Sequence, residues 1–280
     1  MDTLVSTQWL ADAQERVEKI CVIDASMHMP QTGRNARQEF EQGHIPGSVF
    51  FDIQEIADQD NPIPLMLPSL EKFASRMMAI GLTDGVQVVV YDDSDLKTSA
   101  RAWWMLHVFG VHRVSILDGG LRKWKAEGRP LESGSPVIDQ HHLTVRKDHS
   151  LVRDLEQMKK NLTTKAEQVI DTRSSDRFAG MDPEPRSGVR AGHIPGSVNM
   201  PYKDLFDEKG CWKSVEEIRS LVARLGIDIN KSIIATCGSG ITACTASFAL
   251  HRAGCDQIAV YDGSFAEWGT QADTSVITGV

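Results

Sequence analysis

The chain has 280 residues and a formal net charge of −8, with 41% hydrophobic and 24% charged residues. This length predicts two domains of ordinary size, and the composition is that of a globular protein in water. The net charge argues against general affinity for nucleic acids and for anionic membranes, and no apolar run is long enough to predict a membrane span. An anionic substrate would therefore need cations placed locally around it.

The five cysteines are too few, and odd in number, to predict a disulfide framework. No CxxC pair predicts structural zinc, and neither a P-loop nor a dinucleotide-binding glycine motif is present. The N-terminus carries Asp2 and lacks a basic start before an apolar core, which argues against a secretory signal. We expect a reduced, cytoplasmic protein without cofactor or metal.

Short β-branched runs alternate with helical stretches along the chain, in the same order twice. The expected elements of the first half are strands at 21–24, 49–51, 86–91 and 114–117 and helices at 70–80 and 99–109. Those of the second half are strands at 169–171, 198–200, 233–236 and 258–261 and helices at 215–225 and 242–253. Ser69 is a candidate N-cap and Gly81 a candidate C′ residue. This order predicts an α/β fold with two tandem domains, each a mostly parallel sheet flanked by helices on both faces.

Two pairs of segments repeat each other along the chain. Residues 43–48 and 192–197 both read GHIPGS, and the turns at 118–120 (DGG) and 262–264 (DGS) correspond at an offset of 144 (262 − 118). With only two copies of this length, duplication of a whole domain explains the pattern better than a solenoid does.

The offset of 144 sets Trp124 on Trp268 and Asp93 on Cys237. An acid in one copy and a cysteine in the other predict one silent site and one working site. We therefore expect a silent domain at 1–130 with Asp93 in place of the cysteine, a linker at 131–150 and a catalytic domain at 151–280.

The segment 237–242 reads CGSGIT and lies between a predicted strand and a predicted helix. Gly238 and Gly240 would allow positive φ, so that consecutive N–H groups point at one centre. The start of the helix adds unpaired N–H groups and the positive end of its dipole. We expect this environment to hold Cys237 as a thiolate at neutral pH. The alternative is a buried structural cysteine, which we expect for Cys21, Cys211, Cys244 and Cys255.

Taken together, these motifs resemble the tandem rhodanese-type sulfurtransferases over the whole chain. The features that carry the resemblance are both GHIPGS segments, RAWW at 101–104, the DGG and DGS turns followed by Trp, and the loop before the helix. Within that family the loop resembles that of the mercaptopyruvate sulfurtransferases, with Ile241 where valine is common. Thiosulfate-preferring relatives usually carry basic residues after the cysteine, where this chain has Gly238 and Ser239.

The resemblance implies an enzyme that forms a persulfide on Cys237 and passes the sulfur to a thiol, a thioredoxin-like protein or cyanide. It also implies that Arg177 and Arg186 bind the carboxylate and keto oxygen of mercaptopyruvate, a role that suits planar bidentate donors. Gly238, Gly240, Ile241 and Thr242 would line the substrate site, although Thr242 is better explained as a helix cap. Ser239 would hydrogen-bond the reacting sulfur and relay its proton.

Further residues have weaker support from the pattern. Asp171 ends a strand that faces the loop and would either orient Arg177 or cap backbone groups. Arg173 and Arg190 rank below the two other arginines as substrate ligands.

Two histidines begin equivalent turns. His44 matches a histidine of a proton relay in related enzymes, but the acid of that relay is replaced by Asn35. A structural role that holds the turn is the alternative for His44, and also for His193.

Three other functions remain as alternatives. A thiosulfate sulfurtransferase would share the loop, and a non-catalytic sulfur carrier or binding module would share the fold. A phosphatase with a CX5R loop would need an arginine six residues after the cysteine, where this chain has Ala243.

Overall fold

The computed structural model describes residues 3–16, 18–136, 138 and 142–279. Contacts divide the chain into two compact units, one built mainly from residues 1–148 and the other mainly from residues 149–280. Among the described residues, every helix is too short or too polar to cross a lipid bilayer.

The first unit contains five strands: β1 (Leu4–Val5), β2 (Ile20–Asp24), β3 (Ser48–Phe50), β4 (Gln87–Tyr91) and β5 (Val114–Leu117). Its helices are α1 (Thr7–Glu15), α2 (Ala36–Gln42), α3 (Ile53–Ile56), α4 (Leu70–Ala79), α5 (Ser99–Val108) and α6 (Gly120–Ala126), with a 3-10 turn η1 (Pro30–Thr32).

The second unit repeats this arrangement with β6 (Val152–Arg153), β7 (Gln168–Asp171), β8 (Ser197–Asn199), β9 (Ile233–Thr236) and β10 (Ile258–Tyr261). Its helices are α7 (Leu155–Thr164), α8 (Ser175–Ala179), α9 (Val215–Arg224), α10 (Ala243–Arg252) and α11 (Ser264–Trp268), with 3-10 turns η2 (His149–Leu151) and η3 (Tyr202–Leu205).

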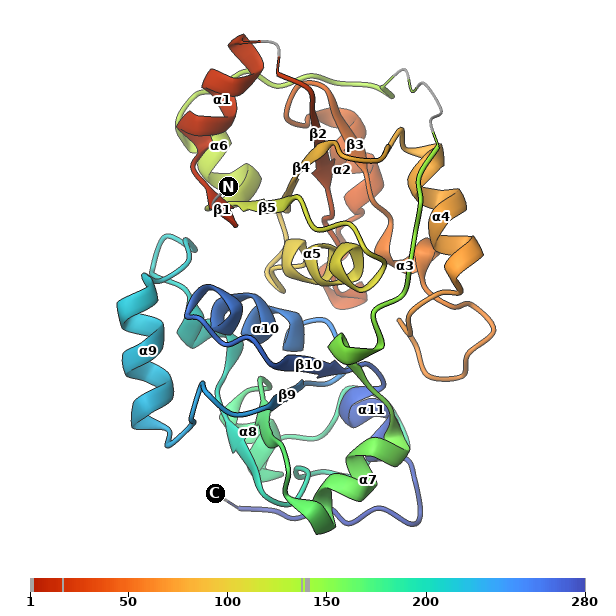
Figure 1. Cartoon of the computed structure of the whole chain (residues 1–280), viewed down its shortest axis with the longest axis vertical. Helices are drawn as coiled ribbons and strands as arrows, with labels where there is room; N and C mark the ends of the chain where they lie inside the picture. Colours follow the sequence, from red (N-terminus) through yellow and green to blue (C-terminus); the bar gives the residue numbers. More distant parts are fainter. Residues whose placement is uncertain (1–2, 17, 137, 139–141, 280) are drawn as a thin grey trace. The chain divides into compact units, whose positions relative to one another are not determined.

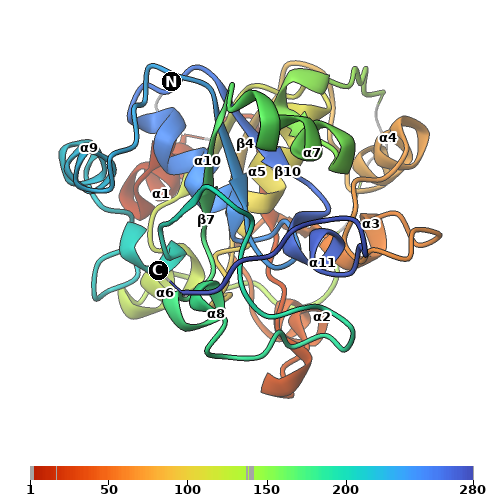
Figure 2. The ribbon, with the colours of Figure 1, turned by 90° about the horizontal axis from the view of Figure 1, so that it is seen from below.

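Both units have the same parallel sheet. The strand orders are β1-β5-β4-β2-β3 and β6-β10-β9-β7-β8, and every strand pair is parallel. In the second unit, Figures 1 and 2 both show α9 and α10 on one face of the sheet and α7 and α11 on the other. The predicted fold class is therefore confirmed, with five strands in each sheet. All eight predicted strands are present, whereas the two-residue edge strands β1 and β6 are too short to show a pattern in the sequence.

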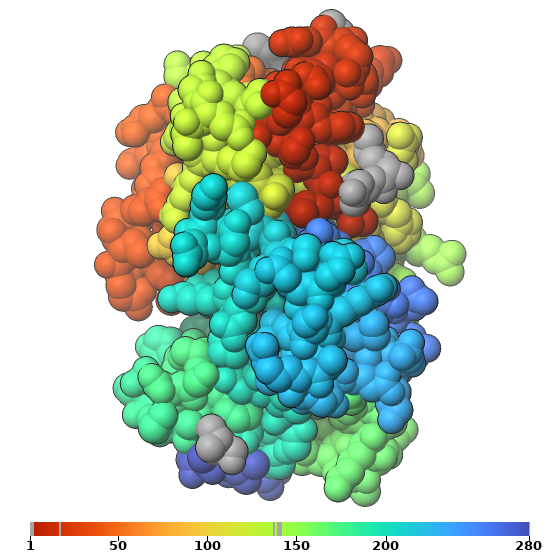
Figure 3. Space-filling view, turned by 90° about the vertical axis from the view of Figure 1, so that its left-hand side faces the viewer, coloured from red at the N-terminus to blue at the C-terminus, as the bar shows by residue number. Residues whose placement is uncertain are grey.

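The helices follow local signals in the sequence. Ser69 caps α4 by accepting a hydrogen bond from Lys72 N–H at 3.1 Å, and Gly81 follows the helix with φ 79°, as predicted. Helix α9 begins at a capping box between Ser214 and Glu217. Its buried residues Ile218, Leu221 and Val222 are spaced on one helical face, and its other face lies on the surface of the second unit (Figure 3).

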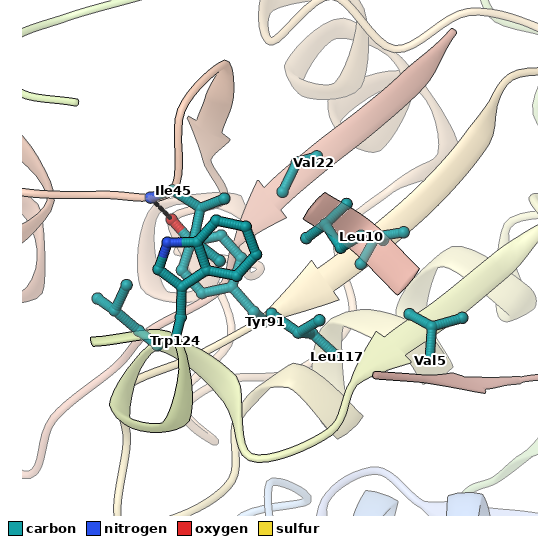
Figure 4. Close-up of a cluster of buried hydrophobic side chains, with 9 residues drawn as sticks. Val5, Leu10, Val22, Ile45, Tyr91, Leu117 and Trp124 are labelled. Atoms are coloured by element: carbon teal, nitrogen blue, oxygen red, sulfur yellow. Dashed lines mark hydrogen bonds between the residues drawn. The ribbon is translucent and has the colours of Figure 1, made fainter. Parts of the chain in front are cut away.

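Each sheet has an aromatic cluster at the same place in the fold. In the first unit Trp124 packs with Leu10, Val22, Ile45 and Tyr91 (Figure 4). The Tyr91 hydroxyl accepts a hydrogen bond from Ile45 N–H at 3.3 Å, which ties the GHIPGS turn to the sheet. The second unit has Trp268, Ile194 and Tyr261 in its cluster. The two tryptophans therefore correspond at the predicted offset of 144.

Part of the segment predicted as a linker packs against the first unit. Thr144 donates from its N–H and its hydroxyl to Asp84, each at 2.9 Å, and Arg146 N–H donates to the carbonyl of Phe109 at 3.1 Å. Leu143 is buried. Residues 137 and 139–141 of this segment lie outside the described residues, and the exact domain boundaries stay a prediction.

The equivalent strands β2 and β7 end on buried aspartates in different surroundings. Asp171 pairs with Arg173, which lies two residues further on. Asp24 is 2% exposed and has Ser26 at the corresponding position. Burial raises the pKa of Asp24 to about 7, although hydrogen bonds with Ser26 and Tyr91 act in the opposite direction. The carboxyl is therefore partly protonated at neutral pH.

We predict that Asp24→Asn removes a pH dependence of stability. Because the folded-state pKa lies above the ordinary value of about 3.9, the free energy of unfolding should fall as pH rises from about 4 to about 7. The neutral amide does not titrate, so the variant should gain stability over the wild-type chain between pH 5 and pH 8 in urea unfolding. An equal loss in both proteins would contradict the prediction. The matched change Asp171→Asn should destabilise at both pH values, because it removes one of the two carboxylates that compensate the buried charge of Arg173.

Candidate functional site

The loop 237–242 connects β9 to α10 at the carboxyl end of a central strand. Cys237 is 2% exposed. The carbonyl groups of Cys237 and Gly238 accept hydrogen bonds from Phe265 N–H and Ala266 N–H of α11, both at 2.9 Å. These hydrogen bonds direct the carbonyl groups toward α11, so the N–H groups of the loop point away from α11. Within the described chain, the N–H groups of Gly238, Ser239 and Ile241 donate to no partner. Such a set of N–H groups can bind an anion on the sulfur of Cys237.

The two loop glycines have different roles. Gly240 has φ 76°, which confirms the predicted left-handed conformation. Gly238 is not among the residues with positive φ, so that part of the prediction is wrong. Its missing side chain instead makes room for Arg177, because a Cβ atom at position 238 would lie 2.8 Å from Arg177 Nη2. Gly238 therefore matters for close approach of a cation.

Thr242 does not cap the following helix. It occupies the N-cap position of α10, but its backbone is already helical (φ −73°, ψ −18°) and its side chain accepts no capping hydrogen bond. The hydroxyl lies 3.0 Å from the hydroxyl of Thr172 instead. The predicted capping role is therefore wrong, and this hydrogen bond ties the loop to the segment after β7.

Strand pairing corrects the alignment of the two copies at the cysteine. Asp171 pairs with Thr236 in the second unit, and its counterpart Asp24 pairs with Tyr91 in the first. Thr236 therefore corresponds to Tyr91, at an offset of 145 (236 − 91), and the next residue, Cys237, corresponds to Asp92. The expected match of Cys237 with Asp93 is wrong by one residue. The reason is loop length, since 92–98 has seven residues and 237–242 has six.

The corresponding loop of the first unit, 92–98, binds the carboxylate of Asp92. This buried carboxylate accepts hydrogen bonds from Ser94 N–H at 2.9 Å and from Ser99 N–H, at the start of α5, at 2.8 Å. Asp93 follows it and is bound by Arg34 at 3.1 Å and Arg122 at 2.8 Å. The first unit therefore fills its own loop with carboxylates, which agrees with the expectation of a silent site.

A buried chain of ion pairs lies beside the cysteine loop. Arg173, which is 2% exposed, donates to Asp171 at 2.6–3.1 Å and to Glu184 at 2.7 Å. Glu184 in turn accepts from Arg177 at 2.5 and 3.1 Å. The Arg173 guanidinium also lies 3.8 Å from the centre of the Phe265 ring. Burial alone would lower the pKa of Arg173, but the carboxylates of Asp171 and Glu184 outweigh burial and raise it.

Arg177 and Arg186 both lie near the loop, but they differ in their ion pairs. Arg177 is held by Glu184, whereas Arg186 is half-buried and forms no ion pair with any described side chain. Burial lowers the pKa of Arg186, Cys237 raises it, and the positive charge of Arg177 lowers it again. The structure thus brings Arg177 and Arg186 together near Cys237.

The lower-ranked arginines have structural roles. Arg173 is the buried anchor described above, and Asp171 binds it rather than Arg177. Arg190 donates to backbone carbonyls of Trp268, Gly269, Gln271 and Thr274, so it holds the C-terminal segment.

His44 and His193 have matching surroundings in their own units. His44 Nδ1 lies 2.6 Å from the carbonyl of Phe40 and its ring stacks on the Phe40 ring. His193 makes the same two contacts with Phe178, at 2.8 Å from the carbonyl. These contacts hold the GHIPGS turns. Asn35 caps α2 through Gln38 N–H, and a proton relay through His44 stays a prediction.

The remaining cysteines form no disulfide among the described residues; Cys244 and Cys255 are buried, and Cys21 and Cys211 are partly buried. Burial raises the pKa of Cys21 to about 12 and also raises that of Cys255, so both stay protonated at neutral pH. Cys244 is fully buried in α10 and its thiol donates to the carbonyl of Gly240 at 3.2 Å.

Sequence reasoning missed Ser264, the first residue of α11. Its hydroxyl accepts from Cys237 N–H at 3.2 Å, donates to the carbonyl of Tyr261 at 2.8 Å and lies 4.0 Å from Cys237 Sγ. Ser264 has φ 50°, a conformation that favours glycine, and its counterpart Gly120 has φ 55°. The change from DGG to DGS was visible in the sequence, but its meaning depends on this backbone conformation.

We predict that the Ser264 hydroxyl supports reactivity at the expense of stability. Ser264→Ala and Ser264→Gly both remove the hydroxyl, and sulfur transfer should slow about tenfold in each, the effect of one lost hydrogen bond. Only glycine relieves the left-handed backbone, which costs on the order of 1 kcal/mol, so Ser264→Gly should melt at a higher temperature than Ser264→Ala. Wild-type rates in the glycine variant would show that the hydroxyl is dispensable.

Comparison with known proteins agrees with this geometry. The model of the rhodanese-like domain matches residues 6–127 and again 154–271. Human 3-mercaptopyruvate sulfurtransferase is 42% identical over 274 residues, which cover 96% of this chain and 92% of the relative. Thiosulfate sulfurtransferase of Bos taurus is 41% identical over 272 residues, which cover 95% and 91%.

A solved structure agrees as well. SseA from Escherichia coli, described as a 3-mercaptopyruvate sulfotransferase with the rhodanese fold, superposes with a TM-score of 0.86 at 36% identity and covers 94% of this chain and 99% of its own. The chain belongs to the rhodanese-like family and contains two copies of its domain.

Proposed function

We infer that this chain is a 3-mercaptopyruvate sulfurtransferase. Relatives named for mercaptopyruvate and for thiosulfate are almost equally similar, so overall identity does not separate the two substrates. The observation that carries the inference is the placement of charge. The residues beside the cysteine, Gly238 and Ser239, are neutral, and the nearby cations Arg177 and Arg186 come from a separate segment.

This placement suits mercaptopyruvate better than thiosulfate. Mercaptopyruvate carries its charge on a carboxylate that is three carbons from the reacting sulfur, so a distant cation can bind it. Thiosulfate is a compact dianion that is best met by charge next to the thiolate. Arg186, which is half-buried and without an ion pair among the described residues, is the natural ligand of the carboxylate. Arg177 would donate to the keto oxygen with the N–H groups that Glu184 leaves free.

In the first half-reaction the Cys237 thiolate attacks the sulfur of mercaptopyruvate. The S–S bond forms as the C–S bond breaks, and the electron pair leaves as the enolate of pyruvate. The proton of the substrate thiol moves to the enolate carbon, so that pyruvate departs and an anionic persulfide stays on Cys237. The N–H groups of the loop would stabilise this anion. In the first unit the carboxylate of Asp92 accepts hydrogen bonds from one N–H group of its own loop and from the first N–H group of α5, which supports this role.

In the second half-reaction a thiolate acceptor attacks the outer sulfur of the persulfide. A new S–S bond forms on the acceptor, and Cys237 leaves as a thiolate. A small thiol or a thioredoxin-like protein can accept the sulfur in this way, whereas cyanide attacks through its carbon and forms a C–S bond, so that thiocyanate leaves. Because the two substrates react in turn at one nucleophile, the kinetics should be ping-pong.

The proposal also includes the residue that relays the proton and the cellular compartment. Ser239 is the candidate relay for the substrate proton because it lies in the loop itself, two residues after Cys237. His44 is the second candidate, although its described contacts are those of a structural residue. The absence of a disulfide among the five cysteines in the described residues supports a reducing compartment such as the cytoplasm.

We predict that Cys237→Ser abolishes release of pyruvate from mercaptopyruvate, because no other described residue offers a thiolate in this loop. Mass spectrometry of the wild-type chain after addition of mercaptopyruvate should show one added sulfur atom on the peptide that contains Cys237. Persistence of more than a few per cent of the activity, or sulfur on another cysteine, would contradict the assignment of the nucleophile.

We predict that Arg186→Ala and Arg177→Ala raise KM for mercaptopyruvate more than KM for thiosulfate. Loss of a charge-assisted bidentate contact should raise KM for mercaptopyruvate by about tenfold to a hundredfold. Arg34→Ala is the matched control, because Arg34 pairs with Glu39 in the first unit as Arg177 pairs with Glu184 in the second. Equal effects on both substrates would rule out a carboxylate clamp.

A further inference from the structure

The two arginines near Cys237 are not equally available to a substrate. Asp171, Arg173, Glu184 and Arg177 form a continuous chain of ion pairs with two negative and two positive charges. The charges of this chain sum to zero. Arg186 lies outside it and forms no ion pair with any side chain in the described ranges. The positive charge left over beside Cys237 is therefore that of one guanidinium.

Glu184 is the residue that sets this balance. Its side chain is 4% exposed and receives Arg173 on one oxygen and Arg177 on both. Arg177 is 26% exposed at its side chain and reaches the loop at Gly238. Without the charge of Glu184, the site would hold two uncompensated guanidinium groups instead of one. Because Glu184 is buried, solvent screens this charge only weakly.

We propose that Glu184 is a specificity-determining residue that restricts the site to singly charged substrates. This inference rests on the proposed function, in which the substrate anion is bound beside Arg177 and Arg186. Mercaptopyruvate brings one negative charge, which Arg186 compensates. Thiosulfate brings two, and the second lacks a partner because Glu184 already neutralises Arg177. The negative charges of the thiolate and of Glu184 both repel an anionic substrate, and both repel a dianion more strongly than a monoanion. Glu184 therefore adds to the discrimination against thiosulfate.

The test is Glu184→Gln, which removes the charge and keeps the size and hydrogen-bonding oxygen of the side chain. Arg173 retains Asp171 and the carbonyl of Gly192 as partners in this variant. The ratio of kcat/KM for thiosulfate to kcat/KM for mercaptopyruvate should rise roughly tenfold or more, the effect of one unit charge in a partly buried site. The ratio is measured on one preparation with cyanide as acceptor, so it does not depend on the fraction of active enzyme.

Two variants separate charge from geometry. Glu39→Gln removes the equivalent carboxylate beside Arg34 in the first unit and should leave the ratio unchanged. Glu184→Asp keeps the charge and shortens the side chain, so it should change the ratio much less than Glu184→Gln does. An unchanged ratio in Glu184→Gln, or an equal change in Glu184→Asp, would overturn the proposal. A wild-type chain that prefers thiosulfate would instead contradict the proposed function.

Inhibition of the unmodified chain provides a measurement that does not depend on folding of a variant. Pyruvate and oxaloacetate share the carboxylate and keto group, but oxaloacetate carries a second carboxylate. Pyruvate should inhibit turnover of mercaptopyruvate more strongly than oxaloacetate does. Stronger inhibition by oxaloacetate would mean that the site accepts a second negative charge, and it would overturn the role given to Glu184.

Discussion

The site depends on one buried ion pair, between Asp171 at the end of β7 and Arg173 two residues later. A guanidinium without solvent exposure must keep its carboxylate partners, because a lone buried charge costs several kcal/mol. Arg173 therefore holds Glu184 in place, and Glu184 holds Arg177 at the loop. The same guanidinium packs on Phe265, whose N–H binds the carbonyl of Cys237. The proposed substrate ligand Arg177 and the proposed nucleophile Cys237 are thus held by the same set of contacts.

The two units show what the same backbone does with and without these contacts. The first unit has Ser26 in place of Arg173, and its strand-end carboxylate, Asp24, lies buried without a cationic partner among the described residues. Its loop binds the carboxylate of Asp92 where the second unit has Cys237. In both units the carbonyl of the first loop residue accepts a hydrogen bond from the helix after the following strand, from Leu121 N–H to Asp92 and from Phe265 N–H to Cys237. The units therefore differ in their charged side chains and in the length of this loop, while the sheet topology is unchanged.

Most of the fold could be predicted from the sequence, because runs of β-branched residues and repeated turns are local signals. The sequence also proposed the cysteine loop and both arginines as candidate site residues, the arginines through resemblance to a family. Two features were missed. The extra residue in the loop 92–98 was missed because the offset of 144 comes from the turns after the loop, whereas the helices before it, α4 and α9, correspond at 145 (215 − 70), as the paired strands do. The role of Ser264 depends on a left-handed backbone, which a serine in the sequence does not predict.

The unequal loop lengths limit what a substitution in the first unit can achieve. A single substitution at Asp92 would introduce a sulfur atom, but the loop would keep seven residues where the other unit has six. The N–H groups would then follow a different spacing around that atom. A site equivalent to that of the second unit would therefore need a one-residue deletion in the loop as well as a substitution at Asp92.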